Sequence, residues 1–164
     1  DVDEMQRMLE AYMAFVKGDA GEMPREVELA ALVQNAARAC RAGSCEIDVP
    51  AGEMVRVKPN AFGRLLSNLI GNAVRYARTV RVSGRIADHM LTLCVDDDGP
   101  GIPADKRAEA FRPFVRLDNA RNLDETGTGL GLAIALDIAR AHGGELRLED
   151  SPKGGLRAVV TVPV

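Results

Sequence analysis

The sequence predicts a two-layer α/β (α+β) sandwich, in which helices pack on one face of a mixed, mostly antiparallel sheet. The chain has 164 residues, 46% of them hydrophobic, which suits one domain with a real core. Helical and strand-like segments alternate irregularly, and neighbouring strands are separated by turn residues, as in hairpins. Together these observations favour one layer of helices on one sheet.

An N-terminal helix is expected over residues 1–17. Its apolar residues recur at spacings of three and four, which is heptad spacing; they are Val2, Met5, Leu9, Tyr12 and Val16. Two heptads fit a coiled-coil seam and an ordinary amphipathic helix equally well. We expect a linker at 18–26 and one domain at 27–164, and a chain that starts within a helix is expected to be part of a longer protein.

Within the domain, the pattern predicts helices, strands and one long loop. The expected ranges are a helix at 27–41, strands at 45–49 and 54–57, a helix at 60–77, strands at 79–87 and 90–96, a helix at 129–142, and strands at 145–149 and 156–162 around a Lys153-Gly154-Gly155 turn. The stretch 98–128 is rich in Gly, Pro and charge, and it is too long for an ordinary connection.

Composition argues against several classes of protein. A net charge of −3 and a pI near 5.5 give no electrostatic argument for nucleic acid or anionic lipid. The three cysteines form no C-x-x-C pair, and the two histidines lie far apart, so neither set predicts a metal site. With no run near ~18 apolar residues and no signal peptide, we expect a reduced, cytoplasmic domain.

The helix at 60–77 carries a polar stripe beside its core face. At roughly 100° per residue, one side gathers Phe62, Leu65, Leu66, Leu69, Ile70 and Ala73. The stripe beside it consists of Asn68, Asn72, Arg75 and Tyr76. Two amide oxygens at i and i+4 suit a hard cation such as Mg²⁺, and Arg75 adds positive charge for a phosphate. The alternative interpretation is a solvated helix edge.

Three carboxylates, Asp96, Asp97 and Asp98, come at the end of the strand predicted at 90–96. Gly99, Pro100 and Gly101 follow them. The dipeptides are those of a tight turn, which explains the glycines but not three acids. One carboxylate at a pocket floor could accept a hydrogen bond from an exocyclic amine. Gly99 and Gly101 would let a flat ring approach the backbone.

A glycine-rich run, residues 127–132, leads into the next helix. It lacks the preceding strand of a Rossmann loop and the Gly-Lys-Ser/Thr of a Walker A loop. It is therefore either a phosphate-binding loop at a helix N-terminus or a flexible hinge. Upstream, Phe111 and Phe114 either anchor a mobile lid over 102–127 or form a small satellite of the core, and Arg116 could reach a phosphate.

The order of these motifs resembles the catalytic domain of sensor histidine kinases, in the ATPase superfamily that also holds gyrase, Hsp90 and MutL. Residues 68–76 resemble the N box, 97–101 the D-x-G-x-G box, 111–114 the F box and 127–132 the second glycine box. The resemblance covers roughly residues 25–164. Residues 97–102 and 112–116 look most like EnvZ-type osmosensor kinases, and the N-terminal helix is similar to the end of that family's dimerisation hairpin.

The resemblance implies a Bergerat-type fold that binds ATP and Mg²⁺. Asn72 would coordinate Mg²⁺ with Asn68 nearby, and Arg75 would face the phosphates. Tyr76 would pack on the base, and Asp97 would accept from the adenine amine. Asn72 and Arg75 would act in catalysis. The further binding residues that it implies are Gly99, Gly101, Ile102, Phe114, Arg116, Gly127, Thr128, Gly129, Leu130, Gly131 and Leu132.

One departure from the superfamily pattern bears on the reaction. Its water-activating ATPases carry Glu four residues before the N-box asparagine, where this chain has Asn68, and an amide is no general base near neutral pH. The resemblance thus implies transfer of the γ-phosphate to a histidine on a dimerisation domain outside this chain. Neither His89, expected at a hairpin, nor His142, at a helix end, matches the acceptor motif.

The same resemblance implies partners for the intact protein. A response-regulator receiver domain would accept the phosphate, and the intact kinase would be a homodimer anchored in the bacterial inner membrane. Two other functions remain as alternatives. An ATP-hydrolysing relative of gyrase is disfavoured by Asn68, and a pure binding module or scaffold is disfavoured by the intact set of four boxes.

Overall fold

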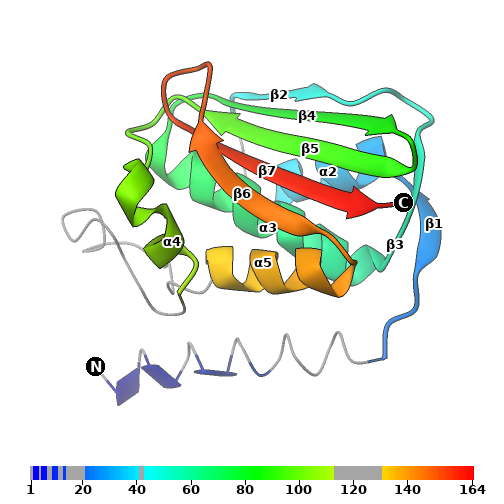
Figure 1. The fold of residues 1–164 in the computed structure, drawn as a ribbon, viewed down its shortest axis with the longest axis horizontal. Coiled ribbons are helices and arrows are strands. Elements are labelled where there is room, and N and C mark those ends of the chain that lie inside the picture. Colours follow the sequence, from blue (N-terminus) through cyan, green and yellow to red (C-terminus); the bar gives the residue numbers. More distant parts are fainter. Residues whose placement is uncertain are drawn as a thin grey trace.

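The computed structural model describes residues 2–3, 5–6, 9–10, 13, 21–40, 43–112 and 131–164. Helices and a sheet form two layers, with α2, α3 and α5 together on one face of the sheet (Figure 1). The elements in chain order are β1 (Arg25–Glu28), α2 (Leu29–Ala39), β2 (Cys45–Asp48), β3 (Met54–Val57), α3 (Pro59–Tyr76), β4 (Val80–Ala87), β5 (Met90–Asp97), the 3-10 turn η1 (Ala104–Lys106), α4 (Arg107–Ala110), α5 (Gly131–Ala141), β6 (Glu145–Asp150) and β7 (Leu156–Pro163).

The main sheet has five strands in the order β2-β4-β5-β7-β6. β2 runs parallel to β4, and the other three pairs are antiparallel. The predicted mixed, mostly antiparallel sheet with helices on one face is therefore confirmed. The hairpins β4–β5 and β6–β7 also match the expected strand pairs. Because β5 and β7 pair with each other, the two hairpins belong to one continuous sheet.

The structure corrects three of the predicted local elements. The helix predicted from residue 27 begins at Leu29, because residues 25–28 form β1, which pairs antiparallel with β3 in a separate two-stranded sheet. β1 thus starts inside the stretch predicted as linker. β2 and β3 do not pair with each other, since each finds a partner elsewhere in the sequence. The long loop predicted at 98–128 contains η1 and α4.

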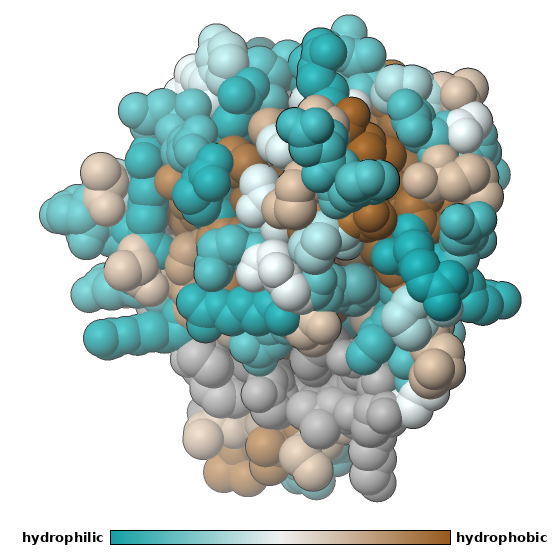
Figure 2. All heavy atoms as spheres, turned by 45° about the vertical axis from the view of Figure 1, so that its right-hand side comes forward, coloured by the Kyte–Doolittle hydropathy of each residue, from teal (hydrophilic) through white to brown (hydrophobic). Residues whose placement is uncertain are grey.

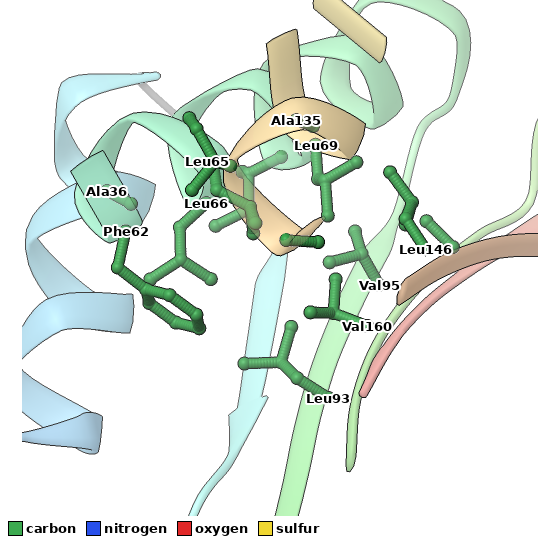
Figure 3. Close-up of a cluster of buried hydrophobic side chains, with 14 of the residues drawn as sticks. Ala36, Phe62, Leu65, Leu66, Leu69, Leu93, Val95, Ala135, Leu146 and Val160 are labelled. Carbon is green, nitrogen blue, oxygen red and sulfur yellow. The ribbon is translucent and has the colours of Figure 1, made fainter. Parts of the chain in front are cut away.

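Helix α3 lies at the centre of the core. All six residues of its predicted apolar face are buried. Figure 3 shows Phe62, Leu65, Leu66 and Leu69 of this helix among side chains from α2, α5 and the sheet, namely Ala36, Ala135, Leu93, Val95, Leu146 and Val160. Pro59 opens the helix, where its missing N–H costs nothing. Glu22 caps it by accepting from the N–H groups of Asn60 and Ala61, at 2.7 and 2.9 Å.

Exposed large hydrophobic side chains are few among the described residues, and several of them belong to the N-terminal seam. On the side drawn in Figure 2 most side chains are hydrophilic, and hydrophobic ones show in small patches. In the N-terminal stretch the described residues are helical, and Val2, Met5 and Leu9 are 78%, 67% and 56% exposed. Tyr12 and Val16 lie outside the described residues. Within the described part of the chain, every helix is too short or too polar to cross a membrane.

Candidate functional site

The acidic turn after β5 is fastened to the segment that follows α3. Asp98 Oδ1 accepts from the backbone N–H groups of Arg78 and Thr79, at 2.9 and 3.0 Å, and its Oδ2 accepts from the Thr79 hydroxyl at 2.9 Å. The bond from the Thr79 N–H is the main cause that lowers the pKa of Asp98. At Gly99 an added Cβ would lie 2.6 Å from the Tyr76 carbonyl oxygen. This close approach requires glycine and brings the turn beside the polar stripe of α3.

Asp97 is the buried carboxylate of this turn, with 5% of its surface exposed. Its Oδ1 accepts from the backbone N–H groups of Gly99 and Leu156, at 2.9 and 3.0 Å. Burial is the main cause that raises the pKa of Asp97 above its ordinary value. Among the described residues, no hydrogen bond reaches Oδ2. One oxygen is therefore fixed by the fold, and the other is available to a donor on a ligand.

The turn between β6 and β7 completes this arrangement at Gly155. Its N–H donates to the Asp97 carbonyl oxygen at 3.1 Å. A Cβ at Gly155 would overlap Asp97 Oδ1 and lie 2.6 Å from both the Asp97 carbonyl oxygen and the Gly99 nitrogen. Gly101 lies against Gly155 with a left-handed φ of 69°. The sequence predicts Gly155 only as a turn residue, because its neighbours along the chain give no sign that this turn reaches the end of β5.

The polar stripe of α3 borders the same region. Asn68, Asn72, Arg75 and Tyr76 are all half-buried, as expected for a stripe at the edge of the core. The Asn68 amide donates to the carbonyl oxygen of Gly131, at 3.3 Å, and so ties α3 to the first residue of α5. The Arg75 guanidinium carbon lies 6.0 Å from the centre of the Tyr76 ring, at the limit of a cation–π contact.

The amide oxygens of the stripe suit Mg²⁺ as metal ligands. Since the Asn68 nitrogen is engaged by Gly131, its carbonyl oxygen is the remaining polar atom of that amide. The Asn72 side chain makes no hydrogen bond with the other described residues. Two neutral oxygens suit an ion that keeps several waters and arrives with a phosphate ligand. The described part of the chain holds no cluster of three or more His, Cys, Asp or Glu side chains for a metal cage.

The expected lid is described only in part. Ile102 is half-buried against the core, and its carbonyl oxygen accepts from Arg107 Nε at 2.9 Å. Arg107 also forms an ion pair with Asp150 at the end of β6, which holds η1 and α4 to the sheet. Phe111 and Leu132 pack against the core. The remaining predicted residues lie outside the described ranges; they are Phe114, Arg116, Gly127, Thr128, Gly129 and Leu130.

Known proteins share this sequence and fold. The family model of the histidine kinase-, DNA gyrase B- and HSP90-like ATPases matches residues 57–164. The sensor histidine kinase CpxA of Escherichia coli is 45% identical over 107 residues, 65% of this chain and 23% of CpxA. The sensor histidine kinase GtrS of Pseudomonas aeruginosa is 36% identical over 165 residues, 99% of this chain and 34% of GtrS. The chain thus spans about a quarter to a third of these curated relatives.

A solved structure covers most of the chain. The histidine kinase domain of the E. coli osmosensor EnvZ is 36% identical, with a TM-score of 0.63 over 88% of this chain and 92% of that domain. The chain therefore belongs to the histidine kinase-, DNA gyrase B- and HSP90-like ATPase family. Its relatives within that family are sensor histidine kinases, and the chain corresponds to the ATP-binding catalytic domain of such a two-component kinase.

The two neighbouring carboxylates Asp97 and Asp98 should affect folding stability in opposite directions. Burial raises the folded-state pKa of Asp97, so its charged form is disfavoured at neutral pH, and this penalty fades as the pH falls through the raised value. Asp97→Asn should therefore increase the free energy of unfolding at neutral pH, within the 0.5–3 kcal/mol range that is roughly typical of point mutations. The gain should shrink in acid.

Asp98→Asn is the matched comparison. The folded-state pKa of Asp98 is lowered, so its ionised form stabilises the fold above the ordinary carboxyl range and loses this effect in acid. That variant should be less stable than the parent at neutral pH. Urea unfolding of both variants at neutral and mildly acidic pH measures the two effects. A less stable Asp97→Asn and an unchanged or more stable Asp98→Asn at neutral pH would contradict these assignments.

Proposed function

We propose that this domain binds Mg²⁺-ATP between the stripe of α3, the acidic turn and the β6–β7 turn, and passes the γ-phosphate to a histidine on a dimerisation domain outside this chain. A response-regulator aspartate would receive the phosphate next. The observation that carries the proposal is the buried Asp97 carboxylate. Two backbone N–H groups hold its Oδ1, and no described residue donates to its Oδ2.

The adenine ring fits the chemistry of the acidic turn. Its exocyclic amine is a donor, and Asp97 Oδ2 is an acceptor without another hydrogen bond among the described residues. Gly99 and Gly101 present backbone rather than side chains, which lets a flat base come close. Tyr76, whose carbonyl oxygen is next to Gly99, would pack on the base, with Ile102 completing an apolar wall.

The phosphates would extend along the stripe of α3. Asn72 would hold Mg²⁺ with Asn68 nearby, and Arg75 would add positive charge. When bound, the ion would neutralise charge on the phosphates. From the lid side we assign contacts to the residues that the sequence resemblance implied, which are Phe114, Arg116, Gly127, Thr128, Gly129, Leu130, Gly131 and Leu132.

Phosphate transfer is favoured over ATP hydrolysis by the composition of α3. The helix, residues 59–76, contains no aspartate or glutamate, so it offers no carboxylate to activate water. Asn68, in the place of the superfamily's glutamate, is engaged with Gly131 and has no proton-accepting group near neutral pH. A nucleophile supplied by another segment therefore fits the site better than water.

The intact protein, by the same proposal, is a homodimeric kinase anchored in the bacterial inner membrane, with this domain on the cytoplasmic side. The exposed seam of the N-terminal helix supports a dimerisation role. Val2, Met5 and Leu9 place apolar surface in water at heptad spacing, and burying it against a hairpin would remove this cost.

Replacing Asn72 tests the metal assignment. Asn72→Ala removes one ligand to a charged ion, so affinity for Mg²⁺-ATP should fall by about tenfold or more. Affinity for ATP with the metal removed by a chelator should stay the same, because the amide acts through the ion. Calorimetric titration in both conditions separates the two effects. Asn60→Ala, which removes an exposed amide from the first turn of the same helix, should change neither affinity. Equal Mg²⁺-ATP affinity in Asn72→Ala and the parent would refute the assignment.

Labelling with γ-³²P-ATP tests the reaction. The 164-residue chain alone should not label itself, because neither His89 nor His142 matches an acceptor. His142 is also held on both ring nitrogens, by the Lys58 N–H and the Ile138 carbonyl oxygen. Adding a separate histidine-bearing hairpin from the same parent protein should place label on the hairpin, and that label should be acid-labile.

The control for this assay is the same hairpin with its histidine replaced, which should remain unlabelled. Stable phosphate on the isolated chain would contradict transfer to an outside histidine. Rapid ATP hydrolysis by the isolated chain would instead favour a gyrase-like ATPase, since it would mean that Asn68 does not prevent attack by water.

A further inference from the structure

Asp96 and Asp97 are consecutive residues of β5 that face opposite sides of the sheet. Asp97 shares its side with the buried Leu93 and Val95, which pack against the helices. Asp96 faces the opposite side of the sheet, over which no helix of the described residues lies (Figure 1). Even so, Asp96 is only 2% exposed. A carboxylate so deeply buried on the open face needs a specific partner.

That partner is Arg157 of β7, which stands directly across from Asp96 in the sheet. Arg157 Nε donates to Asp96 Oδ1 at 2.7 Å, and Nη2 donates to Oδ2 at 3.1 Å, in a two-pronged pair. The Ser151 hydroxyl donates to the same Oδ1 at 2.9 Å. Asp96 therefore accepts hydrogen bonds from Ser151, directly after β6, and from Arg157 in β7. We call Asp96, Arg157 and Ser151 the outer clamp.

The outer clamp closes the turn that carries Gly155 and Leu156. Ser151 N–H donates to the Gly155 carbonyl oxygen at 2.9 Å, and Lys153 N–H donates to the Ser151 hydroxyl at 3.1 Å. Within this closed turn, Gly155 N–H reaches the Asp97 carbonyl oxygen and Leu156 N–H reaches Asp97 Oδ1. Movement of the turn would therefore move the donor that orients Asp97. Asp96 of the clamp and Asp97 are thus neighbouring residues whose side chains lie on opposite faces of the sheet.

We propose that the outer clamp positions Asp97 for base recognition, so that Asp96, Arg157 and Ser151 set the selectivity for a purine with an exocyclic amine without touching it. The inference rests on the proposed function of Asp97. A buried ion pair adds little net stability, because removing both charges from water costs about as much as their attraction returns. The effect of this pair is geometric instead. It holds the β6–β7 turn in place and so fixes the position of the Leu156 N–H, whose nitrogen lies 3.0 Å from Asp97 Oδ1.

The sheet also supplies a matched control. The cross-strand row that contains Asp96 alternates in charge over all five strands; in sheet order it consists of Glu46, Arg81, Asp96, Arg157 and Glu149. Arg81 forms ion pairs with Glu46 and Asp48, at 2.6 Å each, and these are exposed and lie away from the β6–β7 turn. Arg81 and Arg157 are thus the same residue type in the same row, and of the two only Arg157 forms an ion pair with Asp96.

The test compares ATP with purine riboside triphosphate, which lacks the amine, by calorimetric titration with Mg²⁺ present. The parent should prefer ATP by about tenfold. The double variant D96N/R157M, which removes both charges together, should reduce this preference to about twofold while its affinity for purine riboside triphosphate changes by less than about twofold. Arg157→Lys keeps the charge but not the two-pronged geometry, and should give an intermediate preference. Arg81→Met should keep the full preference.

Ser151→Ala provides a milder variant that retains the ion pair, and it should shift the preference in the same direction by a smaller factor. Clamp variants that keep the parent's preference would overturn the positioning role. Equal losses of affinity for both nucleotides would also overturn it, since they indicate a structural role alone. A parent that binds both nucleotides equally would instead refute base recognition by Asp97, and the positioning role would fall with it.

Discussion

One carboxylate oxygen, Asp97 Oδ1, joins segments that are far apart in the sequence. It accepts from Gly99 in the acidic turn and from Leu156 at the start of β7. Asp98 fastens this acidic turn to the segment directly after α3. The helix with the amide stripe, the buried Asp97 carboxylate and the β6–β7 turn therefore meet at one place. This arrangement lowers the folding stability at neutral pH, because burial disfavours the charged form of Asp97 and raises its pKa.

The three consecutive aspartates show how strand geometry separates roles. Alternation of side chains sends Asp96 to the open face and Asp97 to the helix-covered face, and Asp98 leaves the strand to cap the segment after α3. Of these three aspartates, only Asp97 has a carboxylate oxygen without a hydrogen bond to another described residue. The site can thus offer a single acceptor to a base, while the other two carboxylates are satisfied by the protein.

The parts that the sequence predicted well are those set by local periodicity. The apolar face of α3 and both hairpins follow from side-chain spacing and turn residues. The sequence does not predict β1, because residues 25–28 become a strand only by pairing with β3, about thirty residues later. The parallel pairing of β2 with β4 is likewise non-local. The sequence also gives no sign that Gly155 belongs to the site. Glycine is required at this position because a Cβ would meet atoms of Asp97 and Gly99, which are distant in the sequence.

We propose that Asp97 recognises the exocyclic amine of adenine. Adenine offers a donor at the position where guanine offers a carbonyl oxygen, and two facing acceptors would leave a buried polar group unpaired, at a cost of about 1–3 kcal/mol. Calorimetric titration of the parent and of Asp97→Asn with Mg²⁺-ATP and Mg²⁺-GTP is the most direct measurement. We expect the parent to prefer ATP by about tenfold or more, and the folded Asp97→Asn variant to lose most of its ATP affinity. Equal affinity of the parent for both nucleotides, or undiminished ATP binding by the variant, would contradict it.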